Sequence, residues 1–187
     1  QYSIVRMRER DIRMATDDEH YKALAYGQFT RLDKKMYPVI TSVPDKAAET
    51  ARALVEMDKY DLIFLDLPGT VNAEGILYTL SKMDYIFCPI SADRVVLESS
   101  LRFASRINEK LIVSGKSNIK VLHLVWNLVD GREKTELYEV YEQVIAELGL
   151  DVLKTFLPDS KRFRRELSAG HRPLFRSTMF PADRALI

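Results

Sequence analysis

The chain of 187 residues has almost no cysteine, no excess charge of one sign and no long hydrophobic run. Its single cysteine, Cys88, excludes a disulfide framework and favours a cytoplasmic protein. The formal net charge of +1 excludes a molecule that binds nucleic acid through its overall charge, so any such surface must be local. No apolar run approaches the roughly 20 residues that cross a membrane, and no signal peptide is present, so no stable membrane association is expected.

Glycine is also scarce, and its positions exclude a common phosphate site. None of the seven glycines lies in the pattern G-x-x-x-x-G-K-[ST], whose backbone N–H groups cradle nucleotide phosphates. The fragment Gly115-Lys116-Ser117 lacks the preceding glycine and follows a predicted helix rather than a strand. His20, His123 and His171 are isolated and lack metal-ligand spacing, so no zinc site is expected.

The most informative stretch is an apolar run, residues 63–65, that ends on Asp66 and is stopped by Pro68 and Gly69. A short apolar run bounded by turn residues predicts a strand over 61–66 that is buried on both faces. An acid at the carboxyl end of such a strand lies at the rim of the sheet, where open α/β folds bind ligands. The alternative is that Asp66 only caps the following loop.

Strand-like and helical segments alternate along the chain. A loop-to-helix segment is expected over 1–15, and residues 16–19 form a capping-box pattern that starts a helix. This alternation predicts one α/β domain over 1–187, with a mostly parallel sheet covered by helices on both faces. Strands are expected over 37–42, 61–66, 84–90, 119–126 and 152–157, and helices over 16–32, 45–55, 72–82, 93–110, 134–148 and 160–168.

Three of the predicted strand ends carry polar or turn residues: Asp66, Asn127 and Pro158-Asp159. Together with the predicted strand over 84–90, the sequence around these strand ends resembles the ParA/MinD family of deviant Walker P-loop ATPases. The resemblance lies in motif order and spacing and covers residues 38–175. More narrowly, the sequence looks like the ParA-like TraA proteins of Bacteroidales conjugative transposons. The matching runs are Tyr-Asp-Leu-Ile-Phe-Leu-Asp-Leu-Pro-Gly (60–69), Met-Asp-Tyr-Ile-Phe-Cys-Pro-Ile (83–90), Val-Trp-Asn (125–127) and Leu-Pro-Asp (157–159).

The resemblance implies a magnesium–ATP site. Asp66 would be the Walker B acid that contacts Mg²⁺ through water, and the segment after it would be the switch that senses the γ-phosphate, with Pro68, Gly69 and Thr70 as its residues.

The resemblance also implies a base-binding corner. Asn127 would hydrogen-bond the adenine, because a side-chain amide donates and accepts at once. Pro158 and Asp159 would flank the base, largely through backbone groups. From the residues alone, Asn127 equally suits a turn before Asp130, and Pro158-Asp159 suits a plain helix start better than a base contact.

The chain is basic toward its end: residues 154–184 hold eight Lys or Arg against three Asp or Glu. ParA-type proteins bind DNA non-specifically through such a surface as nucleotide-bound homodimers, and they act with a ParB-like partner. Phosphate contacts of this kind are salt-sensitive. The alternative is that these charges only form the solvent-exposed face of a helix. The candidate DNA-binding residues are Lys161, Arg162, Arg164 and Arg165.

The departure from the family is the missing glycine-rich Walker A loop. In the family this loop lies near the N-terminus, and Gln1 would fit just after the second strand, so the chain resembles a member without its first β-α-β unit. Open strand edges recruit other strands. We therefore expect edge pairing with a second copy, or rearrangement of residues 1–37 to cover the gap. The function implied is a ParA-like ATPase domain in DNA partitioning or conjugative transposon transfer; the alternative is a non-catalytic scaffold or dimerisation module.

Residues 1–187 alone are expected not to hydrolyse ATP. Phosphate binding needs loop N–H groups and a lysine, which this chain does not supply in that pattern. Phosphate release from ATP measures the activity, with Asp66→Ala as the comparison. Turnover that depends on Asp66 would contradict the expectation.

Overall fold

The computed structural model describes residues 3–33, 36–57, 60–67, 74–132, 135–161 and 177–180. The chain divides into two compact units, one made of residues 42–159 and the other of residues 1–41 with 160–187. The sequence carries no obvious linker at either junction. The division therefore follows from which residues contact one another, not from a change in composition.

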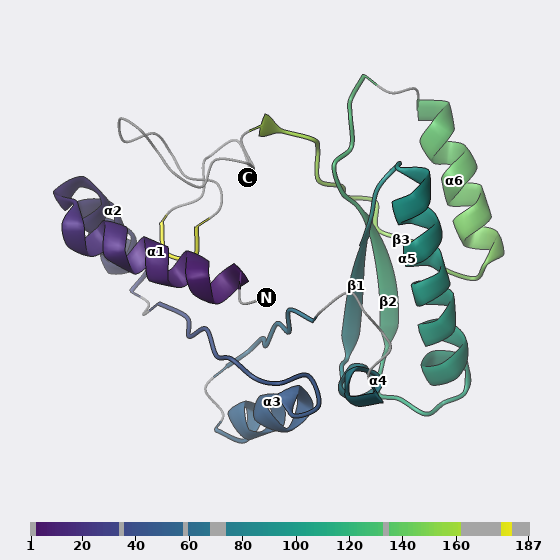
Figure 1. Ribbon diagram of the computed structural model, residues 1–187, viewed down its shortest axis with the longest axis horizontal. Coiled ribbons are helices and arrows are strands. Elements are labelled where there is room, and N and C mark those ends of the chain that lie inside the picture. Colours follow the sequence, from purple (N-terminus) through teal and green to yellow (C-terminus); the bar gives the residue numbers. More distant parts are fainter. Residues whose placement is uncertain are drawn as a thin grey trace. The chain divides into compact units, whose positions relative to one another are not determined.

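The 42–159 unit is built on a three-stranded parallel sheet (Figure 1). Its strands β1 (Tyr85–Ile90), β2 (Val121–Trp126) and β3 (Asp151–Val152) lie in the order β1-β2-β3. Helix α5 (Arg94–Ile107), continued by the π-helix η1 (Asn108–Val113), connects β1 to β2, and α6 (Thr135–Glu147) connects β2 to β3. The predicted α/β class and parallel pairing are confirmed, although the third strand is only two residues long.

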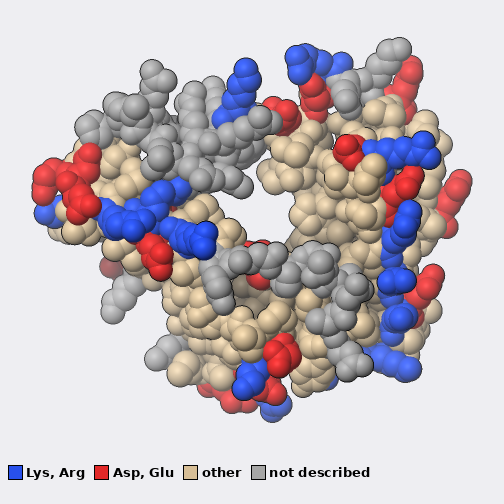
Figure 2. All heavy atoms as spheres, viewed as in Figure 1, with Lys and Arg blue, Asp and Glu red and all other residues tan. Residues whose placement is uncertain are grey.

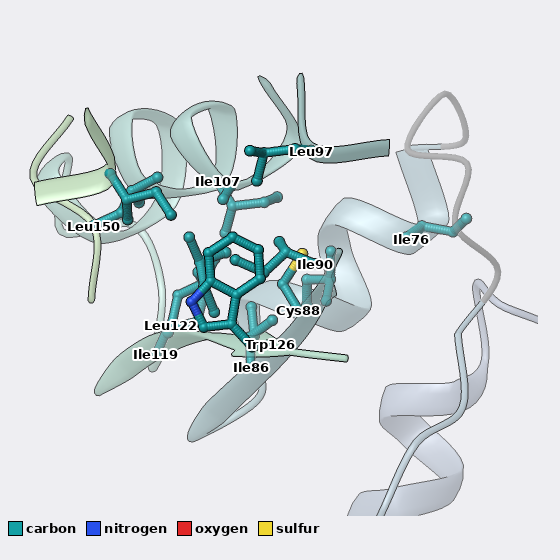
Figure 3. Close-up of a cluster of buried hydrophobic side chains, with 14 residues drawn as sticks. Ile76, Ile86, Cys88, Ile90, Leu97, Ile107, Ile119, Leu122, Trp126 and Leu150 are labelled. Atoms are coloured by element: carbon teal, nitrogen blue, oxygen red, sulfur yellow. The ribbon is translucent and has the colours of Figure 1, made fainter. Parts of the chain in front are cut away.

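The core of this unit lies under one face of the sheet (Figure 3). Alternate side chains of β1 are buried because successive residues of a strand point to opposite faces. The outward side chains Tyr85 and Phe87 are each 53% exposed, so the cover expected on both faces is absent over β1 among the described residues. The buried residues are Ile86, Cys88, Ile90, Leu122, Leu124 and Trp126 from the strands, Ile119 and Leu150 just before β2 and β3, Ile76 and Leu80 from α4 (Glu74–Ser81), Leu97, Ala104 and Ile107 from α5, and Ile145 from α6.

Two aspartates start helices by accepting backbone N–H groups. Asp93 caps α5 as predicted, accepting from the Val96 N–H at 3.0 Å. Asp18 caps α2 (Glu19–Leu32), two residues later than the capping-box pattern suggested. Thr16 belongs instead to α1 (Ser3–Asp17), where its hydroxyl donates to the Ile12 carbonyl at 2.9 Å.

Helices α3 (Ala47–Glu56) and α4 (Glu74–Ser81) pack closely against each other. A Cβ at Gly75 would lie 2.5 Å from the Cβ of Asp45, so glycine is needed there. The Thr79 hydroxyl donates to the Pro44 carbonyl at 2.7 Å, which ties α4 to the start of α3.

The predicted strands over 37–42 and 61–66 are wrong. Residues 36–43 and 60–67 are described and contain no strand. Leu62 and Phe64 are 74% and 81% exposed, which contradicts burial on both faces. An apolar run becomes a strand only where a neighbour completes its backbone hydrogen bonds, and the described strands supply no such neighbour to either segment.

The other unit is organised around the buried carboxylate of Asp11 on α1. This carboxylate accepts hydrogen bonds from Arg10, from the Ser177 hydroxyl at 2.9 Å and from the Thr178 N–H at 2.6 Å. Arg8 is also buried and donates to the Thr178 hydroxyl at 2.8 Å. The charge is thus paired and hydrogen-bonded, as a buried charge must be.

We expect Cys88 to resist thiol reagents in the folded protein. Burial raises the pKa of its thiol to about 11, so the reactive thiolate is scarce at neutral pH. Iodoacetamide at pH 8 should label the native chain far more slowly than the chain in urea, followed by mass spectrometry. The matched control, Cys88→Ala with an exposed Ser114→Cys, should react rapidly in both. Equal native and denatured rates at Cys88 would contradict its place in the core.

Candidate functional site

The ends of β2 and of the chain after β3 meet at one corner of the sheet. The Leu157 N–H donates to the Trp126 carbonyl at 2.8 Å, and Val129 forms a parallel bridge with Pro158. The bridge consists of two hydrogen bonds, from the Val129 N–H to the Leu157 carbonyl (3.0 Å) and from the Asp159 N–H to the Val129 carbonyl (2.8 Å). We call residues 127–130 with 157–159 the corner. It brings together two of the three strand ends singled out in the sequence.

Asn127 enters the corner directly from β2. Its N–H donates to the Ile90 carbonyl at 2.8 Å, and its side-chain oxygen accepts from the Leu128 N–H at 3.0 Å. Leu128 has a φ of 58°, in the left-handed region. The side chain of Asn127 therefore shapes the turn, which was the alternative interpretation. Within the described part of the chain its amide nitrogen has no hydrogen-bond partner.

An ion pair that was not predicted lies in the same turn. Arg132 donates to Asp130 at 2.6 Å and 2.9 Å, and its backbone N–H donates at 3.0 Å. These bonds, the side-chain bond first, lower the pKa of the Asp130 carboxyl to about 2. The hydrogen bond to Asp130 and the charge of that carboxylate raise the pKa of Arg132, and the charge of Asp159 adds to the effect. The Asp-x-Arg spacing in the sequence could have predicted this ion pair.

An aromatic group backs the corner on the core side. The buried Trp126 donates its indole N–H to Glu142 of α6 at 2.8 Å. The ring of Tyr138 lies edge-on at 5.0 Å, and that of Tyr141 at 6.3 Å. A buried indole needs such an acceptor, so α6 is fixed to the strand residue that precedes Asn127.

Asp66 lies in the extended segment 60–67, outside the sheet, and its side chain is exposed. Among the described residues, no hydrogen bond or ion pair joins it to Asn127, Pro158 or Asp159. Its place in a magnesium site stays a prediction. The switch residues Pro68, Gly69 and Thr70 lie outside the described residues.

Of the basic residues proposed for DNA, only Lys161 is described; its side chain is exposed. Arg162, Arg164 and Arg165 lie outside the described residues. Across the described ranges, no three His, Cys, Asp or Glu side chains gather as a metal site. No helix in the same ranges is long and apolar enough to cross a membrane.

The chain was compared with known protein families, curated proteins and solved structures. No protein-family model, curated protein or solved structure matches the chain.

We expect Arg132→Gln to raise the pKa of Asp130 from about 2 toward its ordinary value of 3.8, since the lowering comes from Arg132. A carboxyl with a depressed folded pKa stabilises the fold above its unfolded pKa, and this contribution is lost as pH falls from about 4 to about 2. NMR titration of the carboxyl carbon measures the change. Arg102→Gln, whose partner is Glu98, is the control. An Asp130 that titrates near 3.8 in the unaltered protein would contradict the pairing.

Proposed function

We propose that the corner binds the base of an adenine nucleotide, as part of a ParA-like ATPase domain acting in DNA partitioning or conjugative transposon transfer. The observation that carries the proposal is the Val129–Pro158 bridge, which sets Asn127 beside Pro158 and Asp159. The motif order of the sequence and the parallel β1-β2 pairing agree with a P-loop-like fold. In the intact protein we propose an ATP-bound homodimer that contacts DNA non-specifically and is controlled by a ParB-like partner.

The hydrogen-bonding groups of Asn127 suit an adenine edge. Adenine offers the N7 acceptor beside an amino donor. The amide nitrogen of Asn127 is open as a donor within the described part of the chain. Its oxygen has two lone pairs and accepts one bond from Leu128, which leaves a second acceptor position for the amino group. Asn127 would thus hold the turn and read the base together.

Asp66 is the residue that would hold the magnesium ion of such a site. Mg²⁺ in nucleotide sites takes one or two carboxylates with water and phosphates. Asp66 offers one exposed carboxylate, but the described contacts do not bring it to the corner. Its role in holding Mg²⁺ through water therefore rests on the sequence resemblance alone.

A second candidate, a non-catalytic scaffold or dimerisation module, is favoured by the segment that holds Asp66. Its apolar side chains Leu62 and Phe64 are largely exposed, as in a segment that pairs with another strand. In that case nucleotide binding at the corner would be absent.

We expect ATP at millimolar concentration to shift the amide NMR signals of residues 127–130, Leu157 and Asp159. The binding should be weak because the chain has no glycine-rich phosphate loop. Asn127→Ala should weaken it about two- to tenfold, the equivalent of one hydrogen bond of about 0.5–1.5 kcal/mol. Asn118→Ala is the matched control, because this exposed asparagine precedes β2 at its opposite end.

Three results would reject the adenine site: shifts confined to other residues, equal binding of GTP, or equal loss of affinity in the Asn118→Ala variant. The absence of any shift at saturating ATP would favour the scaffold.

A further inference from the structure

The apolar face of helix α6 is wider than the part of it that the core covers. Ile145 is fully buried, and Tyr138 and Tyr141 pack against the core beside it. A second set of apolar side chains recurs at helical spacing and is 37–55% exposed. We call this set the α6 stripe; it consists of Leu137, Val140, Val144 and Leu148.

A stripe of this kind is costly in water. Apolar surface is more stable when it is removed from water, and contiguous apolar patches rimmed by polar residues mark interaction sites. The spacing of three or four residues matches the anchors by which one helix packs on another. The stripe is therefore shaped for a helical partner.

The charge around the stripe is of one sign. From residue 135 to residue 151 the chain has five acids and no Lys or Arg. The four glutamates of α6 form no ion pair with a basic residue of the described chain; Glu142 accepts only from the neutral Trp126 indole. Glu136 and Glu147 lie beside the stripe by helical spacing. Glu139 and Glu142 lie on the other side of α6, and Asp151 in β3 pairs with His123 at 2.8 Å.

Helix α5 shows that this imbalance is not general. There Arg94 and Arg102 both pair with Glu98, at 2.9 Å and 3.5 Å. Figure 2 shows acidic and basic side chains next to each other in this part of the unit. The single acid of α5, Glu98, is thus matched within the chain. Glu136 and Glu147, beside the stripe, form no ion pair with a described basic residue and are left for an outside cation.

We propose that the α6 stripe binds a basic amphipathic helix of another protein, with Lys or Arg beside its apolar anchors. Two copies of α6 would set glutamate against glutamate, and like charges across an interface cost several kcal/mol. A basic partner gains attraction from the same acids and covers the apolar side chains. The inference stands on α6 alone and does not depend on adenine binding at the corner.

The test uses fluorescence anisotropy with a labelled helical peptide of about 18 residues, carrying Leu at heptad positions a and d and Lys at e and g. We expect the 187-residue chain to bind it, and Val140→Ala/Val144→Ala to weaken binding about tenfold or more. Val95→Ala/Val96→Ala, the same change on exposed valines of α5, should leave binding unaltered. Glu136→Gln/Glu147→Gln should weaken binding and flatten its salt dependence.

Circular dichroism must show unchanged helix content in each variant, so that lost binding reports the surface. Equal binding of a peptide with Glu at e and g would overturn the proposal, as would equal weakening by the α5 variant. Sedimentation that shows a wild-type dimer dispersed by Val140→Ala/Val144→Ala would also overturn it, because a second copy would then be the occupant.

Discussion

Backbone hydrogen bonds formed by the chain beyond the end of β3 hold the candidate site together. β3 pairs only two residues with its neighbour, yet the chain after it continues to bond to β2 and to the turn that follows. The backbone N–H groups of Leu153, Leu157 and Asp159 donate to the carbonyls of Leu124, Trp126 and Val129, respectively. Peptide groups at a sheet end need hydrogen-bond partners, and here each partner lies on β2 or on the turn that follows it. The main chain thus sets most of the corner, and the side chain of Asn127 adds one hydrogen bond within its turn.

Helix α6 links the two surfaces to which we assign roles. One face contributes Glu142, the acceptor for the Trp126 indole behind the corner. The stripe lies on a different face and is bordered by acids that the chain does not neutralise. The core residue Ile145 holds the helix against the sheet, so both surfaces are presented by one rigid element. Sites on helices and strands are held more precisely than sites on loops.

Features that depend on residues close together in the sequence could be predicted, whereas features that depend on distant residues could not. Asp93 starts α5 because its carboxylate reaches an N–H three residues away, and this can be read from the sequence. The strands at 84–90 and 119–126 were also recognised, since each is a short apolar run bounded by turns. The run before Asp66 is a similar short apolar run. However, a strand forms only beside another strand that completes its hydrogen bonds, and the composition of the run does not show whether such a strand is present. The buried carboxylate of Asp11 was missed for a similar reason, because its partners lie far along the chain.

That separation has a consequence for biosynthesis. The bond between Asp11 and the Thr178 backbone spans 167 positions. A ribosome adding about 5–20 residues per second completes such a distance in roughly 8–33 s. Throughout that interval the Asp11 carboxylate on the nascent hairpin of α1 and α2 lacks two of its partners, because Ser177 and Thr178 have not been translated. This unit therefore acquires its native packing after the sheet of the 42–159 unit has already left the ribosome.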